Sequence, residues 1–189
     1  YRLGDFYEMF FDDALVASKE LEITLTGKSC GLEERAPMCG IPYHAVEGYL
    51  SKLVSRGYKV AICEQVEDPK LAKGLVKREV IRVVTPGTNL NVQSLEAGKN
   101  NYLLSIAYTP DGIGISAADV TTGDYYVTEV EDLKKLNDEL MKYEPSEIIC
   151  NEAFLVSGFD VNDLKSRLHI SVNALESHMF DDDGCRRIL

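Results

Sequence analysis

Hydrophobic and polar positions along the first 90 residues predict short strands and helices that follow one another. The aromatic and apolar stretch 3–11 is typical of a strand. Asp12 offers an N-cap for a short helix that reaches Leu21. The β-branched run 23–26 predicts another strand, and the polar stretch 28–37 predicts a loop.

The same half continues with one longer helix and two more strands. Apolar residues recur at helical spacing over 43–56, and Gly57 suits the C-terminal end of that helix. The runs 60–63 and 79–84 are apolar and β-branched, as strands are. Strands and helices interspersed in this way predict an α/β domain with a mixed sheet.

The second half has a different order of elements. Three strands separated by turn residues come first, and a helix follows, before strands and helices alternate. The expected strands are 102–108, 113–120, 124–130, 147–150 and 169–172, and the expected helices are 133–143 and 161–168. This order is that of the ribonuclease-H-like fold.

A boundary between two domains is expected near residues 87–99. The apolar pattern breaks at Thr85-Pro86-Gly87-Thr88-Asn89, and a polar stretch then runs to Asn101, which is linker chemistry. We therefore predict a first domain over 1–90, a linker over 91–99 and a second domain over 100–189.

The charge changes at the same boundary. The net charge is −11, but residues 1–90 carry 12 Lys/Arg against 13 Asp/Glu, a net of −1. Residues 91–189 carry 8 against 18, a net of −10. Because phosphates repel so acidic a surface, any contact with nucleic acid is expected in the first half.

Several classes of protein are excluded by composition. No apolar run approaches the roughly 18 to 20 residues of a membrane span, and no signal peptide is visible. The five cysteines are odd in number and widely spaced, which argues against disulfides or a zinc site and for a reducing cytosol. The chain starts without Met inside an expected strand, so we expect it to be part of a longer protein.

Two enzyme patterns are incomplete. Thr26-Gly27-Lys28-Ser29 resembles the end of a phosphate-binding P-loop, but Glu22 stands where the motif needs its first glycine. A metal-dependent nuclease on the second half would need carboxylates at strand ends, and Asp119, Asp124 and Glu152 are candidates. The first strand of that half lacks an Asp, and turn-forming aspartates on an acidic surface are the simpler interpretation.

The segment Gly4-Asp5-Phe6-Tyr7-Glu8 carries the most specific signal. Strand alternation would place Tyr7 in the core and turn Phe6 and Glu8 to the other face. An exposed Phe can enter the minor groove of DNA and unstack a base step, which costs about a few kcal/mol. A mispaired base is already poorly stacked, so the cost is lower there.

Four blocks in the first half are similar to signatures of the MutS family of DNA mismatch repair proteins. They are Gly4-Asp5-Phe6-Tyr7-Glu8-Met9-Phe10 with Asp12-Asp13-Ala14, Pro37–Ala45, Val60–Gln65 and Arg82–Thr88. The second half resembles the connector domain of the same family, which is ribonuclease-H-like and not catalytic. Its best block is Asp119-Val120-Thr121-Thr122-Gly123.

The resemblance implies a function and site residues. Phe6 matches the family's Phe that stacks on the mispaired base, and Glu8 matches the Glu that hydrogen-bonds it. The implied partners are mismatched duplex DNA and, through the connector domain, a MutL-type protein, in the bacterial cytosol near the nucleoid. In this family the full-length protein is a homodimeric ATPase that uses ATP and magnesium. The ATPase domain lies outside these 189 residues, so no cofactor and no enzyme activity are expected in this part.

One basic cluster in the first half has two interpretations. The cluster consists of Lys70, Lys73, Lys77, Arg78 and Arg82. It would suit contacts to DNA phosphates, and it would equally suit a solvated loop and strand edge. A third function for the chain is a module that only binds other proteins through its acidic second half.

Overall fold

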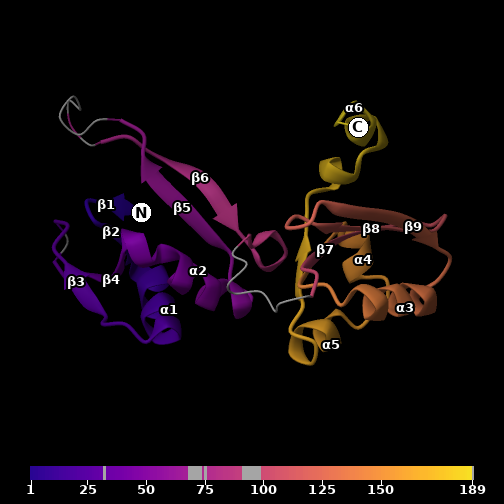
Figure 1. Ribbon diagram of the computed structural model, residues 1–189, viewed down its shortest axis with the longest axis horizontal. Helices are drawn as coiled ribbons and strands as arrows, with labels where there is room; N and C mark the ends of the chain where they lie inside the picture. Colours follow the sequence, from indigo (N-terminus) through magenta and orange to yellow (C-terminus); the bar gives the residue numbers. More distant parts are fainter. Residues whose placement is uncertain (32, 68–73, 75, 91–98, 189) are drawn as a thin grey trace. The chain divides into compact units, whose positions relative to one another are not determined.

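The computed structural model describes residues 1–31, 33–67, 74, 76–90 and 99–188 (Figure 1). The chain divides into two compact units, Tyr1–Thr85 and Pro86–Leu189. Each unit has its own sheet and its own buried cluster, and each is described by itself below.

The first unit contains a four-stranded sheet in the order β1-β2-β4-β3. Its strands are β1 (Arg2–Leu3), β2 (Phe6–Phe10), β3 (Thr26–Lys28) and β4 (Ala36–Pro42). All three neighbouring pairs are antiparallel. Gly4 has φ +61°, the left-handed conformation that favours glycine, and it lets the chain reverse tightly between β1 and β2.

Two helices cover one face of this sheet. They are α1 (Phe11–Leu21) and α2 (Val46–Ser55), the latter preceded by the 3-10 helix η1 (Tyr43–Ala45). Their buried side chains meet the inner face of β4 in one cluster, which consists of Ala14, Ala17, Leu21, Cys39, Ile41 and Leu53. The opposite, outer face of the sheet carries Glu8 and Phe10 of β2 and Lys28 of β3.

A two-stranded antiparallel ribbon completes the unit (Figure 1). Its strands are β5 (Val60–Gln65) and β6 (Arg78–Val84). Val84 packs with Leu50 and Val54 of α2, which joins the end of the ribbon to the helical layer.

Four predictions for the first unit are wrong in detail. The strand expected at 3–11 is divided into β1 and β2 by the turn at Gly4, and residue 11 already belongs to α1. Residues 36–42 form the central strand β4, although the expected loop reached residue 37. The strand expected at 23–26 lies at Thr26–Lys28. Asp12 lies in the first turn of α1, whose N-cap is Phe10, so its carboxylate acts on the helix dipole from inside the helix.

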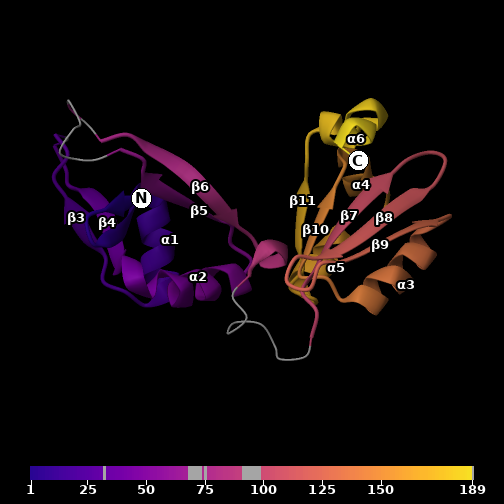
Figure 2. The same ribbon diagram turned by 45° about the horizontal axis from the view of Figure 1, so that its top comes forward.

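The second unit contains a five-stranded sheet in the order β11-β10-β7-β8-β9 (Figure 2). The strands are β7 (Tyr102–Tyr108), β8 (Ile113–Asp119), β9 (Asp124–Val130), β10 (Glu147–Cys150) and β11 (Ser171–Ala174). β7, β8 and β9 form an antiparallel meander, whereas β10 and β11 run parallel to β7. The prediction of mixed α/β architecture is therefore confirmed.

Helices bury one face of this sheet. They are α3 (Leu133–Tyr143), α4 (Glu152–Leu155) and α5 (Val161–Ser166), and η4 (Ser177–Phe180) and α6 (Asp182–Ile188) follow β11. Strand alternation places Leu104 and Ile106 of β7 opposite Ala117 and Ile115 of β8, and all four side chains are buried. Leu140 of α3 packs into the same cluster. None of the helices in the described ranges is long and apolar enough to cross a membrane.

The start of the second unit differs from the expected linker. Pro86–Thr88 forms the 3-10 helix η2, in which the Gly87 amide donates to Glu147 Oε2 at 3.1 Å. Asn101 Nδ2 donates to the Pro86 carbonyl at 3.0 Å. The two compact units divide at Thr85/Pro86. Of the expected linker 91–99, residues 91–98 lie outside the described residues.

Candidate functional site

The aromatic and the carboxylate singled out in the sequence lie on one face of β2. Tyr7 and Met9 pack against the core, so the alternation of the strand turns Phe6 and Glu8 to the outer face. Phe6 is 47% exposed, which is unusual for a phenylalanine at the start of a central antiparallel pair. The pair thus combines an exposed aromatic ring with an acceptor two residues away.

Gly40 of β4 leaves space for this pair. It lies directly opposite Glu8 in the antiparallel register. A Cβ at position 40 would lie 3.6 Å from Glu8 Cγ, 3.8 Å from Phe6 Cδ1 and 3.3 Å from the Tyr7 carbonyl oxygen. A single Cβ would therefore touch both side chains at ordinary contact distance and crowd the Tyr7 carbonyl oxygen, so position 40 leaves room for little more than glycine beside the pair.

Lys28 of β3 forms an ion pair with Glu8. Its Nζ lies 2.6 Å from Glu8 Oε2, and the side chains are 43% and 17% exposed. The ammonium also lies 5.5 Å from the centroid of the Phe10 ring. The sequence alone did not identify Lys28 as part of this site. It pointed to Lys28 only as a member of the incomplete P-loop pattern.

Tyr7 fixes the strand from the inner side. Its hydroxyl donates to the Glu64 carboxylate of β5. Burial raises the pKa of Tyr7, and the hydrogen bond to Glu64 raises it further. The Arg2 guanidinium lies 3.8 Å from the centroid of the Tyr43 ring, while the Tyr43 amide donates to the Asp5 carbonyl at 3.0 Å. The turn that carries Phe6 is therefore held from both ends.

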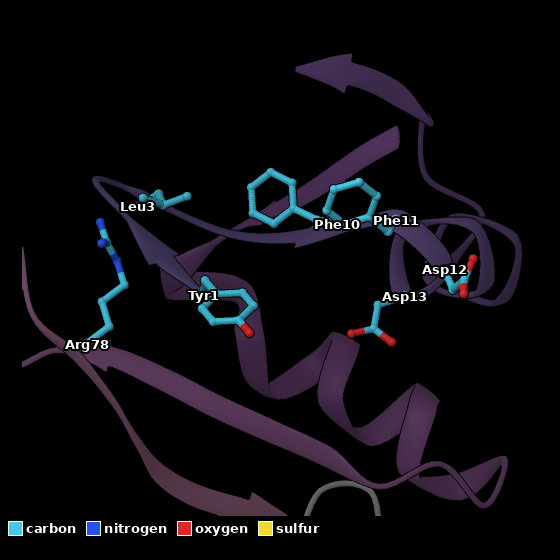
Figure 3. Close-up of a pocket in the computed structure, with 7 residues that line it drawn as sticks. All are labelled: Tyr1, Leu3, Phe10, Phe11, Asp12, Asp13 and Arg78. Carbon is cyan, nitrogen blue, oxygen red and sulfur yellow. The ribbon is translucent and has the colours of Figure 1, made fainter. Parts of the chain in front are cut away.

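A hollow of about 560 Å³ opens beside the site, at the junction of β2 and α1. Figure 3 shows the rings of Phe10 and Phe11 next to each other, with Tyr1 and Asp13 across from them. The other lining residues are Leu3, Asp12 and Arg78. Phe6 and Glu8 are not among the residues that line it.

The described members of the basic cluster have partners within the protein. Arg78 donates to the carbonyls of Arg2 and Val76 at 3.2 and 3.0 Å. Lys77 lies 2.5 Å from Glu79, and the hydrogen bond to that carboxylate raises the pKa of Lys77.

Of the remaining members of the basic cluster, the structure describes Arg82 alone. Arg82 lies 3.5 Å from Glu47 across the surface. Lys70 and Lys73 lie outside the described residues.

The candidate nuclease carboxylates have structural partners in the second unit. Asp119 accepts four hydrogen bonds, two of them from the amide and hydroxyl of Thr121. Asp124 accepts from Thr122, and Glu152 lies in the first turn of α4. Among the described residues, no group of three or more His, Cys, Asp or Glu side chains could hold a metal ion.

Comparison with known proteins places both units. Residues 1–93 match the family model of MutS domain I, and residues 101–181 match that of MutS domain II. The chain is 69% identical to the DNA mismatch repair protein MutS of Lachnoclostridium phytofermentans over 183 residues, which cover 97% of this chain and 20% of that protein.

Two further relatives give the same result. Proteins of the same name from Acetivibrio thermocellus and Ruminiclostridium cellulolyticum are each 54% identical, over 97% and 100% of this chain. The matches cover 21% and 22% of those proteins, so the chain spans about a fifth of the length of the curated relatives it matches.

Proposed function

This chain belongs to the MutS family, of which it carries domains I and II, and from that premise we propose that it recognises mispaired or unpaired bases in duplex DNA. The observation that carries the proposal is the exposed Phe6 ring beside the Glu8 carboxylate on the outer face of β2. Phe6 acts on base stacking, and Glu8 acts on hydrogen bonding.

Phe6 is proposed to enter the minor groove and stack on the mispaired base. Inserting an apolar wedge unstacks a base step at about a few kcal/mol, and a mispaired step has already lost part of that stacking. The preference for a mismatch thus comes from a lower deformation cost as well as from a contact. The hydrogen bond from Tyr7 to Glu64 and the Arg2 guanidinium beside the Tyr7 ring support this role, because they hold β2 in place against the force of insertion.

Glu8 is proposed to accept a hydrogen bond from the base on which Phe6 stacks. A carboxylate near the DNA backbone is repelled by phosphates on every duplex. A base that donates a hydrogen bond to Glu8 compensates this repulsion, and a matched pair offers no such donor, so Glu8 favours mismatched over paired DNA.

The basic cluster is proposed to contact phosphates. Arg82 and Lys77 are exposed enough to exchange their carboxylate partners for DNA phosphates. Arg78 instead donates to a backbone carbonyl and so stabilises the ribbon. Lys70 and Lys73 belong to the same proposal. One lost phosphate contact should lower the salt slope of binding by about one unit.

The rest of the activity is proposed to reside in the longer protein. ATP and magnesium are assigned to the longer protein, because Glu22 interrupts the P-loop pattern and, among the described residues, no group of three or more His, Cys, Asp or Glu side chains could hold a metal ion. We propose a homodimeric ATPase in the bacterial cytosol, near the nucleoid, whose domain II contacts a MutL-type protein. Within it, the present chain senses the base pair.

Replacing Phe6 with Ala in the full-length protein tests the wedge. Preference for a mismatched over a matched duplex should be lost, while weak, salt-sensitive duplex binding remains. The measurement is the dissociation constant for two duplexes that differ only at the mismatch. Phe11→Ala is the matched control, because it removes another exposed ring from the same domain. Mismatch preference that survives Phe6→Ala would refute the proposal.

Replacing Glu8 with Ala tests the acceptor separately. Affinity for matched DNA should rise, because the repulsion from phosphates is gone, and the ratio between mismatched and matched affinity should fall. The same pair of duplexes serves as the readout. Equal losses of affinity on both duplexes would contradict the assigned role.

A further inference from the structure

We propose that Lys28 is a specificity-determining residue, whose ammonium shares the Glu8 carboxylate with the mispaired base. Lys28 thereby raises affinity for every duplex and lowers the preference for a mismatch. The inference rests on the proposed function, since it concerns the same site. The inference adds the Lys28 ammonium of β3 to Phe6 and Glu8, the two site residues that the sequence motif contains.

The position of Lys28 makes the contact specific. It lies at the end of β3, which is separated from β2 by the central strand β4. From there its side chain reaches over the outer face, passes the Phe10 ring and ends 2.6 Å from Glu8 Oε2. The ammonium thus lies between the Phe10 ring and the carboxylate to which it donates.

The ion pair is better placed than an ordinary surface pair. Glu8 is only 17% exposed, so water screens its charge less than that of a free side chain. Of the side chains that the structure describes, Lys28 is the one recorded as donating to this carboxylate. The Glu8 carboxylate is therefore already hydrogen-bonded to Lys28 before DNA binds.

On matched DNA, Lys28 compensates Glu8. No base is placed to donate to the carboxylate there, so a bare Glu8 would only repel the backbone phosphates. The paired ammonium cancels that charge locally, and the outer face meets DNA as a near-neutral surface. Loss of Lys28 should therefore weaken matched binding most.

On mismatched DNA, Lys28 competes with the base. Its contact is to Oε2, so Oε1 remains for a base N–H, but the neighbouring ammonium draws negative charge away from both oxygens. Glu8 is then a weaker acceptor for the base than it would be alone. Loss of Lys28 strengthens that hydrogen bond and offsets part of the lost compensation.

The test uses Lys28→Met in the full-length protein. Methionine keeps an unbranched apolar chain over Phe10 and removes only the charge. Affinity for the matched duplex should fall by more than affinity for the mismatched one. The mismatch-to-match ratio should rise by about 1.5- to fivefold, the range that one partly exposed ion pair supports.

A double-mutant cycle with Glu8→Gln separates this mechanism from a direct contact to DNA. If Lys28 acts through Glu8, Lys28→Met should leave the ratio unchanged in the Glu8→Gln background. Lys28→Arg should keep the ratio near that of the wild type, because it restores the ion pair. Lys19→Met is the control for net charge, since Lys19 is an exposed residue of α1 in the same domain.

Three outcomes would overturn the inference. They are an unchanged ratio in Lys28→Met, a lower ratio in Lys28→Met, and an equal effect of Lys28→Met in the presence and absence of Glu8. Lys28→Gln serves as a second neutral variant should Lys28→Met lose its folded circular dichroism spectrum. Phe6→Ala is measured alongside: loss of the wedge abolishes preference in every background, so failure of the proposed function is visible separately.

Discussion

At the scale of single residues, Asp119 at the end of β8 is a buried carboxylate surrounded by hydrogen-bond donors. Asp119 is 1% exposed and accepts hydrogen bonds from the Thr121 hydroxyl and amide, at 2.6 and 2.8 Å. It also accepts from the Asn101 amide and Asn100 Nδ2, both at 2.9 Å. Burial raises the pKa of Asp119, but these donors outweigh burial and hold the pKa below its ordinary value of 3.8.

Asp119→Asn should therefore destabilise the second unit in a pH-dependent way. Its side-chain amide would bring hydrogens to a site already filled with donors, which costs about 1–3 kcal/mol at neutral pH. A lowered pKa gives stability that is fully present above pH 3.8 and is lost progressively as the pH falls below that value and through the lower pKa of the folded protein. Urea unfolding followed by circular dichroism at pH 7 and near pH 3 should show the gap between wild type and variant shrinking in acid.

The matched control for this prediction is Asp124→Asn in the same turn. Asp124 is exposed and accepts from Thr122 at 2.9 Å, so its substitution should cost clearly less. A gap for Asp119→Asn that stays constant with pH would show that the carboxylate is not the source of the stability.

Residues on one strand could be predicted from the sequence, but their neighbours across the sheet could not. The alternation of β2 separates Tyr7 from Phe6 and Glu8 without any tertiary information. Gly40 and Lys28 reach Glu8 only through the register of β2 on β4 and of β4 on β3. Pairing register is a property of the folded sheet, so neither residue carried a local signal.

At the scale of elements, the second unit follows its sequence pattern closely and the first unit does not. β7, β9, α3 and β10 have the predicted bounds, because each has a clear period and turn residues at both ends. β4 contains Pro37, Gly40 and Pro42, which are poor strand residues. It forms a strand because β2 and β3 pair with it on both sides, and tertiary pairing overrides local propensity.

The C-terminal end of α1 offers a test at this scale. Glu22 adopts φ 57° and ψ 42°, and its amide donates to the Ser18 carbonyl. A non-glycine residue in this left-handed conformation costs about 1–2 kcal/mol. Glycine adopts the conformation without steric cost, and its own cost is about 0.5–1 kcal/mol of lost conformational entropy. Glu22→Gly should therefore stabilise the first unit by up to about 1 kcal/mol in urea unfolding.

Glu22→Ala distinguishes the conformation from the side chain. It removes the same exposed carboxylate but keeps the strained φ, so it should give no gain in stability. If Ala stabilised the protein as much as Gly, loss of the charge rather than relief of the backbone would be the cause.

At the scale of the whole molecule, the change in net charge along the chain indicates the division into two units. Residues 86–90 carry no charge, so the net charges of −1 and −10 hold for the two observed units as well. The Pro-Gly segment looked like a linker, since such dipeptides usually mark loops. Instead, Gly87 lies where an added Cβ would be 2.9 Å from Leu103 Cβ and 3.0 Å from Glu147 Cβ. Only the packed structure shows that the segment starts the second unit.

The two units should unfold separately, because each buried cluster is complete within its own unit. Leu140 is fully buried in the cluster of the second unit, and Leu53 belongs to that of the first. Leu140→Ala should cost about 2–5 kcal/mol, and amide hydrogen exchange of the 189-residue chain should show faster exchange in β7, β8 and α3 only. Leu53→Ala should act on β2, β4 and α1 alone. If either substitution accelerated exchange in both units, the two units would unfold as one cooperative body and the separation predicted here would be wrong.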